Sequence, residues 1–251
     1  MEQETQTTPK KRCKLLGVLQ ANTIPIAIVV AGLLIGAAVL LKDNGQSKVA
    51  AAQAAPAAAG AGQAKPANID EIKTAGNPFI GNVNAPVTVA YWYDYQCPFC
   101  KQVESTIIPS LINDYVNAGK VKIVFKGFPV LGSDSQTAAL AERGVWEAAP
   151  QQFYKWHAAM YEKQDGENTG WGNRQDIMAL MNSLGLDEKK IDALIVAKSS
   201  TYQQALQADM DEGQAYGVTG TPSFMIGKKL IVGAVPYDQI KAAVEEVLKT
   251  K

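Results

Sequence analysis

Hydrophobic and polar positions divide this chain of 251 residues into two parts of different character. From residue 15 to residue 41 no side chain carries a charge, and from Ile24 onward nearly all are apolar. A helix of about 20 apolar residues crosses the hydrocarbon core of a membrane, so residues 15–41 predict a transmembrane helix. A cleaved signal peptide has a shorter apolar region of roughly 7–15 residues, and small residues follow it closely. Here the first such site lies near Ala50, so we expect a retained signal anchor.

Basic residues immediately before this stretch predict its orientation. They are Lys10, Lys11, Arg12 and Lys14. Because positively charged flanks stay in the cytoplasm, we expect residues 1–14 to form a cytoplasmic stub. The chain after Lys42 is then expected on the periplasmic or cell-wall side of the cytoplasmic membrane. Cys13 belongs to the stub, where we interpret it as an incidental thiol.

Residues 42–76 predict a disordered linker. Between residues 50 and 67 nearly every residue is Ala, Gly, Gln or Pro. Such a composition buries too little apolar surface to offset the entropy of ordering the chain. We therefore expect the domain that follows to be tethered but mobile.

The pattern after the linker predicts one α/β domain over residues 77–251. Runs of β-branched and aromatic residues at 87–93 and 121–125 predict two strands. Between them, apolar residues at helical spacing over 103–116 predict a helix with a kink at Pro109. A strand, a helix and a strand form a βαβ unit, which implies parallel strands and a right-handed crossover.

The second half of the domain predicts a helical block, a hairpin and a last helix. Residues 133–213 contain no strand-like run, and Ser133, Asn173 and Asp187 are candidate N-caps within them. Two short strands follow, separated by Gly227 and Lys228, and an amphipathic pattern over 240–248 completes the chain. The predicted order is therefore strand, helix, strand, helical insertion, hairpin, helix.

Composition and charge exclude several classes of function. The 24 Lys and Arg residues balance 24 Asp and Glu residues, so the chain lacks the excess of positive charge of a general nucleic-acid binder. Three Cys and one His are too few for a disulfide-stapled scaffold or for an ordinary four-ligand zinc site within one chain. We expect neither a nucleic-acid partner nor a bound metal or cofactor.

Cys97 and Cys100, with Pro98 and Phe99 between them, carry the candidate chemistry. The preceding strand places Cys97 at a helix N-terminus, where unpaired N–H groups and the helix dipole favour a thiolate. Pro98 suits the first turn because its missing N–H would have no partner there. We predict that Cys97 is the attacking thiol and that Cys100, one turn into the helix, is the resolving thiol.

Two other roles are open to this pair: half of a zinc site and a structural disulfide. Half of a zinc site would need ligands from a second chain, because no second cysteine pair exists. A structural disulfide usually links distant segments, whereas a bond between Cys97 and Cys100 would constrain the unfolded chain little. The spacing therefore favours redox chemistry.

Three segments resemble the DsbA-like thiol–disulfide oxidoreductases. They are residues 85–89 (APVTV), 94–100 (DYQCPFC) and 217–224 (GVTGTPSF). The resemblance covers residues 77–251 and implies a thioredoxin-like fold with an inserted all-helical domain, which fits the order of elements above. It also implies that Pro222 is a cis-proline beside the cysteines and that Thr221 presents backbone groups to a substrate strand.

Two positions depart from the family pattern. Phe99 stands where the strongly oxidising DsbA has His, so it offers no hydrogen bond to the Cys97 thiolate and we expect a less oxidising disulfide. Tyr91 stands where members of the family often have an acid that helps move the proton of the resolving thiol. Either Tyr91 or another group such as Lys126 must substitute for that acid, or exchange is slower.

His157 is the only histidine of the chain. Its neighbours at helical spacing are aromatic and apolar, so we interpret it as a packed residue of the helical domain rather than a catalytic one. Phe224 and Trp92 are interpreted as core. The tryptophans of the insertion are interpreted as its core or groove: Trp146, Trp156 and Trp171.

Together these features predict a membrane-tethered thiol–disulfide oxidoreductase that donates disulfides to exported proteins. The resemblance implies that a quinone-linked membrane partner, similar to DsbB or its functional equivalents, reoxidises the cysteines. One alternative is a reductase or isomerase that passes electrons the other way, although residues 43–76 look too disordered to supply an isomerase's dimerisation domain. The other is a redox-inactive holdase or scaffold that binds proteins through the helical insertion.

Overall fold

The computed structural model describes residues 64–167 and 169–251. The predicted stub at 1–14, the predicted anchor at 15–41 and most of the predicted linker lie outside these residues. Within the described part, no helix is both long and apolar enough to cross a membrane.

One five-stranded sheet forms the centre of the domain, in the order β1-β3-β2-β4-β5. The predicted βαβ unit is confirmed, because β2 (Val87–Tyr93) and β3 (Val121–Gly127) pair in parallel around α2 (Pro98–Leu111). The predicted hairpin is also confirmed, with β4 (Ser223–Ile226) antiparallel to both β2 and β5 (Lys229–Val232). The sequence pattern did not reveal β1 (Phe79–Ile80), because two residues are too few to show an alternation.

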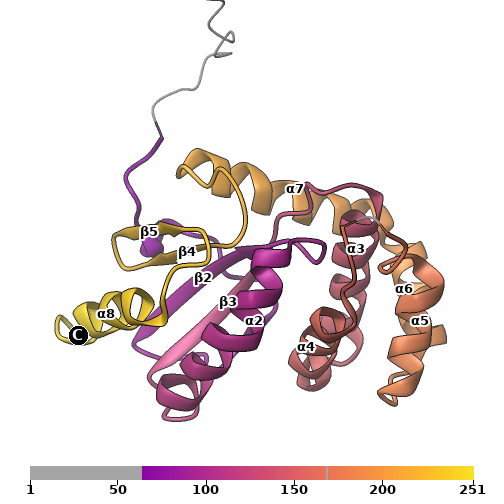
Figure 1. Cartoon of the computed structure of the whole chain (residues 1–251), viewed down its shortest axis with the longest axis horizontal. Coiled ribbons are helices and arrows are strands. Elements are labelled where there is room, and N and C mark those ends of the chain that lie inside the picture. The colour runs from indigo at the N-terminus through magenta and orange to yellow at the C-terminus, as the bar shows by residue number, and fades with distance from the viewer. Residues whose placement is uncertain (1–63, 168) are drawn as a thin grey trace, which may run out of the picture. The chain divides into compact units, whose positions relative to one another are not determined.

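Helices cover both faces of this sheet (Figure 1). Helix α2 and the final helix α8 (Tyr237–Leu248) pack on the face that carries Tyr91 and Phe224. The opposite face, which carries Trp92, is covered by α7 (Ser199–Ala215) and a short 3-10 turn, η1 (Ile69–Glu71). The sequence predicted a kink at Pro109. In the structure α2 contains Pro109 and continues directly into a π-helical turn, η2 (Ile112–Val116).

The predicted helical insertion is confirmed and lies beside the sheet in Figure 1. Before α7 it consists of α3 (Ser133–Ala148), η3 (Pro150–Gln152), α4 (Phe153–Lys163), α5 (Arg174–Ser183) and α6 (Glu188–Ala197). Asn173 and Asp187 cap α5 and α6 by accepting backbone N–H groups, as expected. The N-cap predicted at Ser133 is wrong, because Gly132 occupies the cap position with a φ of 104° and Ser133 is the first helical residue.

The predicted domain boundary at residue 77 needs correction. The Lys65 N–H donates to the Ala215 carbonyl and the Ile69 N–H to the Gly227 carbonyl, both at 2.8 Å. Ile69 and Ile72 are buried in the cluster that contains Trp92. These two isoleucines follow the Ala-rich stretch and supply the apolar surface that it lacks. The folded domain therefore includes residues 65–76.

Candidate active site

Cys97 lies at the junction between β2 and α2, as predicted. It is the N-cap of α2, with extended backbone angles, and Pro98 is the first helical residue. The Cys97 carbonyl accepts the N–H groups of Cys100 and Lys101, both at 3.1 Å. The thiol of Cys97 is therefore held at the end of the helix where backbone N–H groups are unpaired and the dipole is positive.

The two thiols differ strongly in acidity. The pKa of Cys97 falls to about 6, because the Cys100 thiol, the Thr221 side chain and the backbone N–H groups of Phe99 and Cys100 donate to it. Burial and the neighbouring Cys97 raise the pKa of Cys100 well above its usual value. Cys97 is 4% exposed and Cys100 is fully buried, so the predicted division into an attacking and a resolving thiol fits this geometry.

The loop before β4 brings Thr221 and Pro222 to the cysteines. The Thr221–Pro222 peptide bond is cis, as the resemblance implied. In its protonated form the Cys97 Sγ donates to the Thr221 carbonyl at 3.4 Å. The role of Thr221 and Pro222 in binding substrate stays a prediction.

Phe99 lies on the surface beside this pair. Its side chain is 59% exposed, and its neighbour Pro98 is exposed as well. An aromatic ring cannot donate a hydrogen bond to the Cys97 thiolate as an imidazole N–H can. Its exposure means that residue 99 can be changed without disturbing the core.

Tyr91 and Lys126, the two candidates for the missing acid, lie on opposite faces of the sheet. Tyr91 stacks on Phe224 at 4.7 Å between ring centroids, and its pKa is raised by burial and by the adjacent Cys100. Lys126 forms ion pairs with Asp209 and Glu212 of α7 at 2.6 and 2.9 Å. Lys126 therefore cannot serve Cys100, and of the two only Tyr91 adjoins the resolving thiol.

Two residues that were not predicted as support hold the loop that carries Cys97. The buried Asp94 carboxylate accepts the backbone N–H groups of Val130 and Leu131 and the Ser135 hydroxyl, at 2.5–3.0 Å. The buried Gln164, just after α4, donates its amide to the carbonyls of Tyr95 and Cys97 at 2.7 and 3.1 Å. The position of Asp94 directly after a strand was a usable signal, whereas nothing in the sequence distinguishes Gln164.

His157 is fully buried among aromatic rings, which confirms the interpretation of a packed residue. Its two ring nitrogens nevertheless have polar partners. Nε2 lies 3.0 Å from Glu104 Oε1, and Nδ1 lies 2.7 Å from the Tyr95 hydroxyl. The Tyr95 hydroxyl in turn donates to Glu142 at 2.7 Å. Neither glutamate was predicted from the sequence as part of the site.

Among the described residues, no group of three or more His, Cys, Asp or Glu side chains is placed to hold a metal ion. The chemistry that the site supports is thiol–disulfide exchange. A thioredoxin-like fold with an acidic thiol at a helix N-terminus, a buried second thiol and a neighbouring cis-proline defines a thiol–disulfide oxidoreductase.

Comparison with known proteins gives the family. Residues 73–246 match the family model described as thioredoxin. Disulfide bond formation protein D of Bacillus subtilis is 32% identical over 179 residues, which cover 70% of this chain and 79% of that protein. The chain belongs to the DsbA-like thiol–disulfide oxidoreductases of the thioredoxin family.

Solved structures agree with this assignment. The oxidised form of BdbD from Bacillus subtilis has a TM-score of 0.66 and 30% identity, and the match covers 74% of this chain and all of that one. The thiol–disulfide exchange protein alpha-DsbA2 from Wolbachia pipientis has a TM-score of 0.61 and 26% identity, covering 68% of this chain and 87% of that one.

Proposed function

We propose that this oxidoreductase works outside the cytoplasmic membrane and donates the Cys97–Cys100 disulfide to exported proteins. One observation carries the direction of electron flow: the pKa of Cys97 is lowered to about 6. A thiolate that is stabilised at neutral pH lowers the free energy of the reduced form, which makes the disulfide form a better oxidant. The name of the Bacillus subtilis relative, which refers to disulfide bond formation, supports the same direction.

The geometry supports the following sequence of steps. A substrate thiolate attacks Sγ of Cys97 in the disulfide form, the bond to Cys100 breaks, and Cys100 takes the electron pair and then a proton. A second substrate thiolate attacks the substrate sulfur of the mixed disulfide, and Cys97 leaves as a thiolate. The substrate loses two electrons to form its disulfide, and the enzyme gains them as two reduced sulfurs.

Location and partners are part of the same proposal. The basic flank at 10–14 and the apolar stretch at 15–41 support a single membrane span with the catalytic domain outside. A tethered domain meets other proteins of the same membrane at a raised effective concentration. We therefore include a membrane redox partner, similar to DsbB or its equivalents, that reoxidises Cys97 and Cys100.

The reduction potential of the full chain in detergent, equilibrated against glutathione, tests the direction. An oxidant is expected near about −120 to −150 mV, because DsbA lies near −120 mV. A value near about −270 mV, as in thioredoxin, would overturn the proposal and favour a reductase. The Cys97→Ser variant is the control, since it cannot form the bond and should show no redox transition.

A further inference from the structure

Glu104 is a buried carboxyl group one helical turn beyond Cys100. Its side chain is 2% exposed, and Oε1 lies 3.0 Å from His157 Nε2. Oε2 makes no hydrogen bond with any residue that the structure describes. A buried carboxyl oxygen without a partner costs free energy, so its position calls for an explanation beyond packing.

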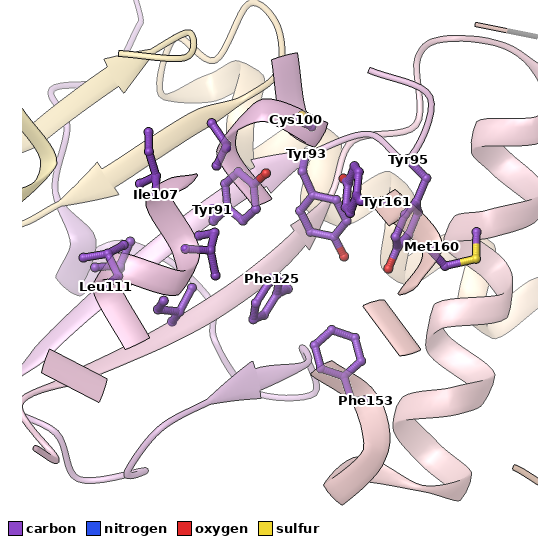
Figure 2. Close-up of a cluster of buried hydrophobic side chains, with 14 of the residues drawn as sticks. Tyr91, Tyr93, Tyr95, Cys100, Ile107, Leu111, Phe125, Phe153, Met160 and Tyr161 are labelled. Carbon is purple, nitrogen blue, oxygen red and sulfur yellow. The ribbon is translucent and has the colours of Figure 1, made fainter. Parts of the chain in front are cut away.

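Two tyrosines lie near both Glu104 and Cys100. Tyr91 of β2 and Tyr161 of α4 are fully buried, which raises their pKa values, and both lie in the electrostatic field of Cys100 and of Glu104. The Tyr161 hydroxyl donates to the Asp94 carbonyl at 3.1 Å, so of the two only the Tyr91 hydroxyl is a candidate relay. The Tyr91 hydroxyl has no hydrogen-bond partner of good geometry among the described residues. Figure 2 shows the tyrosines in a row below Cys100: Tyr91, Tyr93, Tyr161 and Tyr95.

A cleft between α2 and α4 leads from Glu104 to solvent. Its volume is about 430 Å³, and its walls include Lys101, Glu104, Tyr161 and Glu162. Most of its wall is apolar, and the charged groups of Lys101, Glu104 and Glu162 are the polar partners that water molecules can find there. The carboxyl group therefore has the buried thiol on one side, through Tyr91, and a route for protons on the other.

We propose that Glu104, held in place by His157, is the positioning residue that supplies and removes the proton of Cys100. When a thiolate attacks Cys97 and the disulfide breaks, Cys100 Sγ receives the electron pair, and a proton passes to it from the Glu104 carboxyl through the Tyr91 hydroxyl or a water. The carboxylate is reprotonated from solvent through the cleft. In the reverse direction the same steps remove the proton, so the role does not depend on the direction of electron flow.

The chemistry of Cys100 requires such a group. A thiol whose pKa is raised by burial is a poor leaving group as an anion, so its departure is faster when a proton is delivered. The resemblance to the family implies an acid on β2 for this purpose, and this chain has Tyr91 there. Glu104 supplies a carboxyl group from α2 instead.

Several titratable groups face Glu104 and contribute to any pH dependence. His157, Tyr154 and Tyr161 face it from α4, Tyr91 from β2, and Tyr95 from the loop before α2. Glu142 lies behind His157, with 3.9 Å between Oε2 and Nδ1. The remaining charged groups are those of the cleft wall: Lys101 and Glu162.

The test is the pH dependence of disulfide reduction in the full chain with Glu104→Gln. The rate constant for reduction by dithiothreitol, corrected for its thiolate fraction, is measured by stopped-flow fluorescence from pH 5 to 9. We expect a rate about tenfold or more below that of the wild-type chain, and a change in the shape of the pH profile. The titration of the Cys97 thiolate at 240 nm should keep its midpoint. Glu167→Gln, which makes the same change at an exposed glutamate outside the cleft, should behave as the wild type.

An unchanged rate and profile in Glu104→Gln would overturn the proposal. An equal loss in Glu167→Gln would also overturn it. So would a slower rate with the same profile and a lower Tm, which would indicate a structural role. A second measurement applies even if the variant does not fold. In the wild-type chain, reduction should be slower in D₂O after the same correction, and the absence of an isotope effect would equally overturn the proposal.

Discussion

The two faces of the sheet each bury a cluster of charged side chains, and the clusters differ in how well they are paired. On the α7 face, Asp209 and Glu212 accept from Lys126, and Asp209 also pairs with Arg143. On the α2 face, Glu104 and Glu142 share His157 and two tyrosine hydroxyls, and each glutamate keeps one oxygen without a hydrogen bond among the described residues. On the α7 face Arg143 Nε also lacks a hydrogen-bond partner among these residues, but both carboxylates meet a cation.

The difference in pairing indicates that the α7-face cluster contributes to stability and the α2-face cluster to the reaction. A buried cluster in which each carboxylate meets a cation holds residues 65–77, β3 and α7 in one arrangement. The under-paired cluster lies beside the cysteines, where a carboxyl group can gain and lose a proton. Buried groups left with unsatisfied atoms are a common mark of functional sites.

The largest expected effect is on the cysteines of the α2 face. Cys97→Ser should abolish exchange, because no other described thiol can attack, whereas Cys100→Ala should accumulate mixed disulfides that cannot be resolved. Non-reducing gels and mass spectrometry of trapped complexes measure both. Cys13→Ser is the control and should leave exchange unchanged. Similar residual activity in the Cys97 and Cys100 variants would contradict the division of roles.

Removing one charge from the paired cluster on the α7 face should lower the stability of the fold and leave the pKa of Cys97 unchanged. Asp209→Asn leaves Lys126 and Arg143 buried with one fewer counterion, and removing one partner of a buried pair costs about 3–5 kcal/mol. Urea unfolding measures the loss, and absorbance at 240 nm follows the Cys97 thiolate. A shift of the Cys97 pKa in this variant would show that the charges of the paired cluster act on the cysteines, contrary to the comparison.

The under-paired cluster should instead show itself in the pH dependence of stability. Burial raises the pKa of Glu142 to about 8, so the folded state keeps a proton that the unfolded chain loses near pH 4.5. This contribution is fully present below pH 4.5 and is lost as the pH rises toward 8. Because Glu142→Gln has no such ionisation, its stability relative to the wild type should rise by roughly 2 kcal/mol between pH 5 and pH 7. Unfolding curves at several pH values measure it, and a constant difference would contradict the shift.

The smallest change concerns residue 99. Phe99→His adds a donor beside the Cys97 thiolate at an exposed position, so it should lower the pKa of Cys97 and make the disulfide more oxidising. One pKa unit corresponds to about 30 mV for this two-electron couple. Equilibration with glutathione measures the potential, with Phe99→Leu as the control. An unchanged potential in the histidine variant would mean that the backbone and Thr221 contacts already saturate the thiolate.

The sequence predicted the parts of this molecule that depend on local patterns. The strand at 87–93, the hairpin, the helical block and the position of Cys97 at a helix N-terminus all follow from periodicity, caps and spacing. The inclusion of residues 65–76 in the fold was missed, because two isoleucines in a polar, Ala-rich stretch are a weak signal until their pocket is known.

The acidic neighbours of the site were missed for a different reason. Glu104 is the only acid of α2, and Glu142 lies on α3, which also carries the exposed Glu147. The packing of α4 against both helices buries Glu104 and Glu142, and the sequence pattern does not show that packing. The spacing of four residues between Cys100 and Glu104 places both on one side of α2, which was a usable signal. The role of His157 could not be seen, because its partners come from separate elements.

The hydrogen bonds of Gln164 make the backbone course of the loop that carries Cys97 independent of the side chains between the two cysteines. Gln164 holds the loop through the main-chain carbonyls of Tyr95 and Cys97, and every amino acid carries such a carbonyl. The residues between the two cysteines can therefore be exchanged while the loop keeps its course. In evolutionary terms, single substitutions at position 99 can change the redox potential of the protein. The hydrogen bonds from Gln164, which follows α4 of the helical insertion, do not depend on those substitutions.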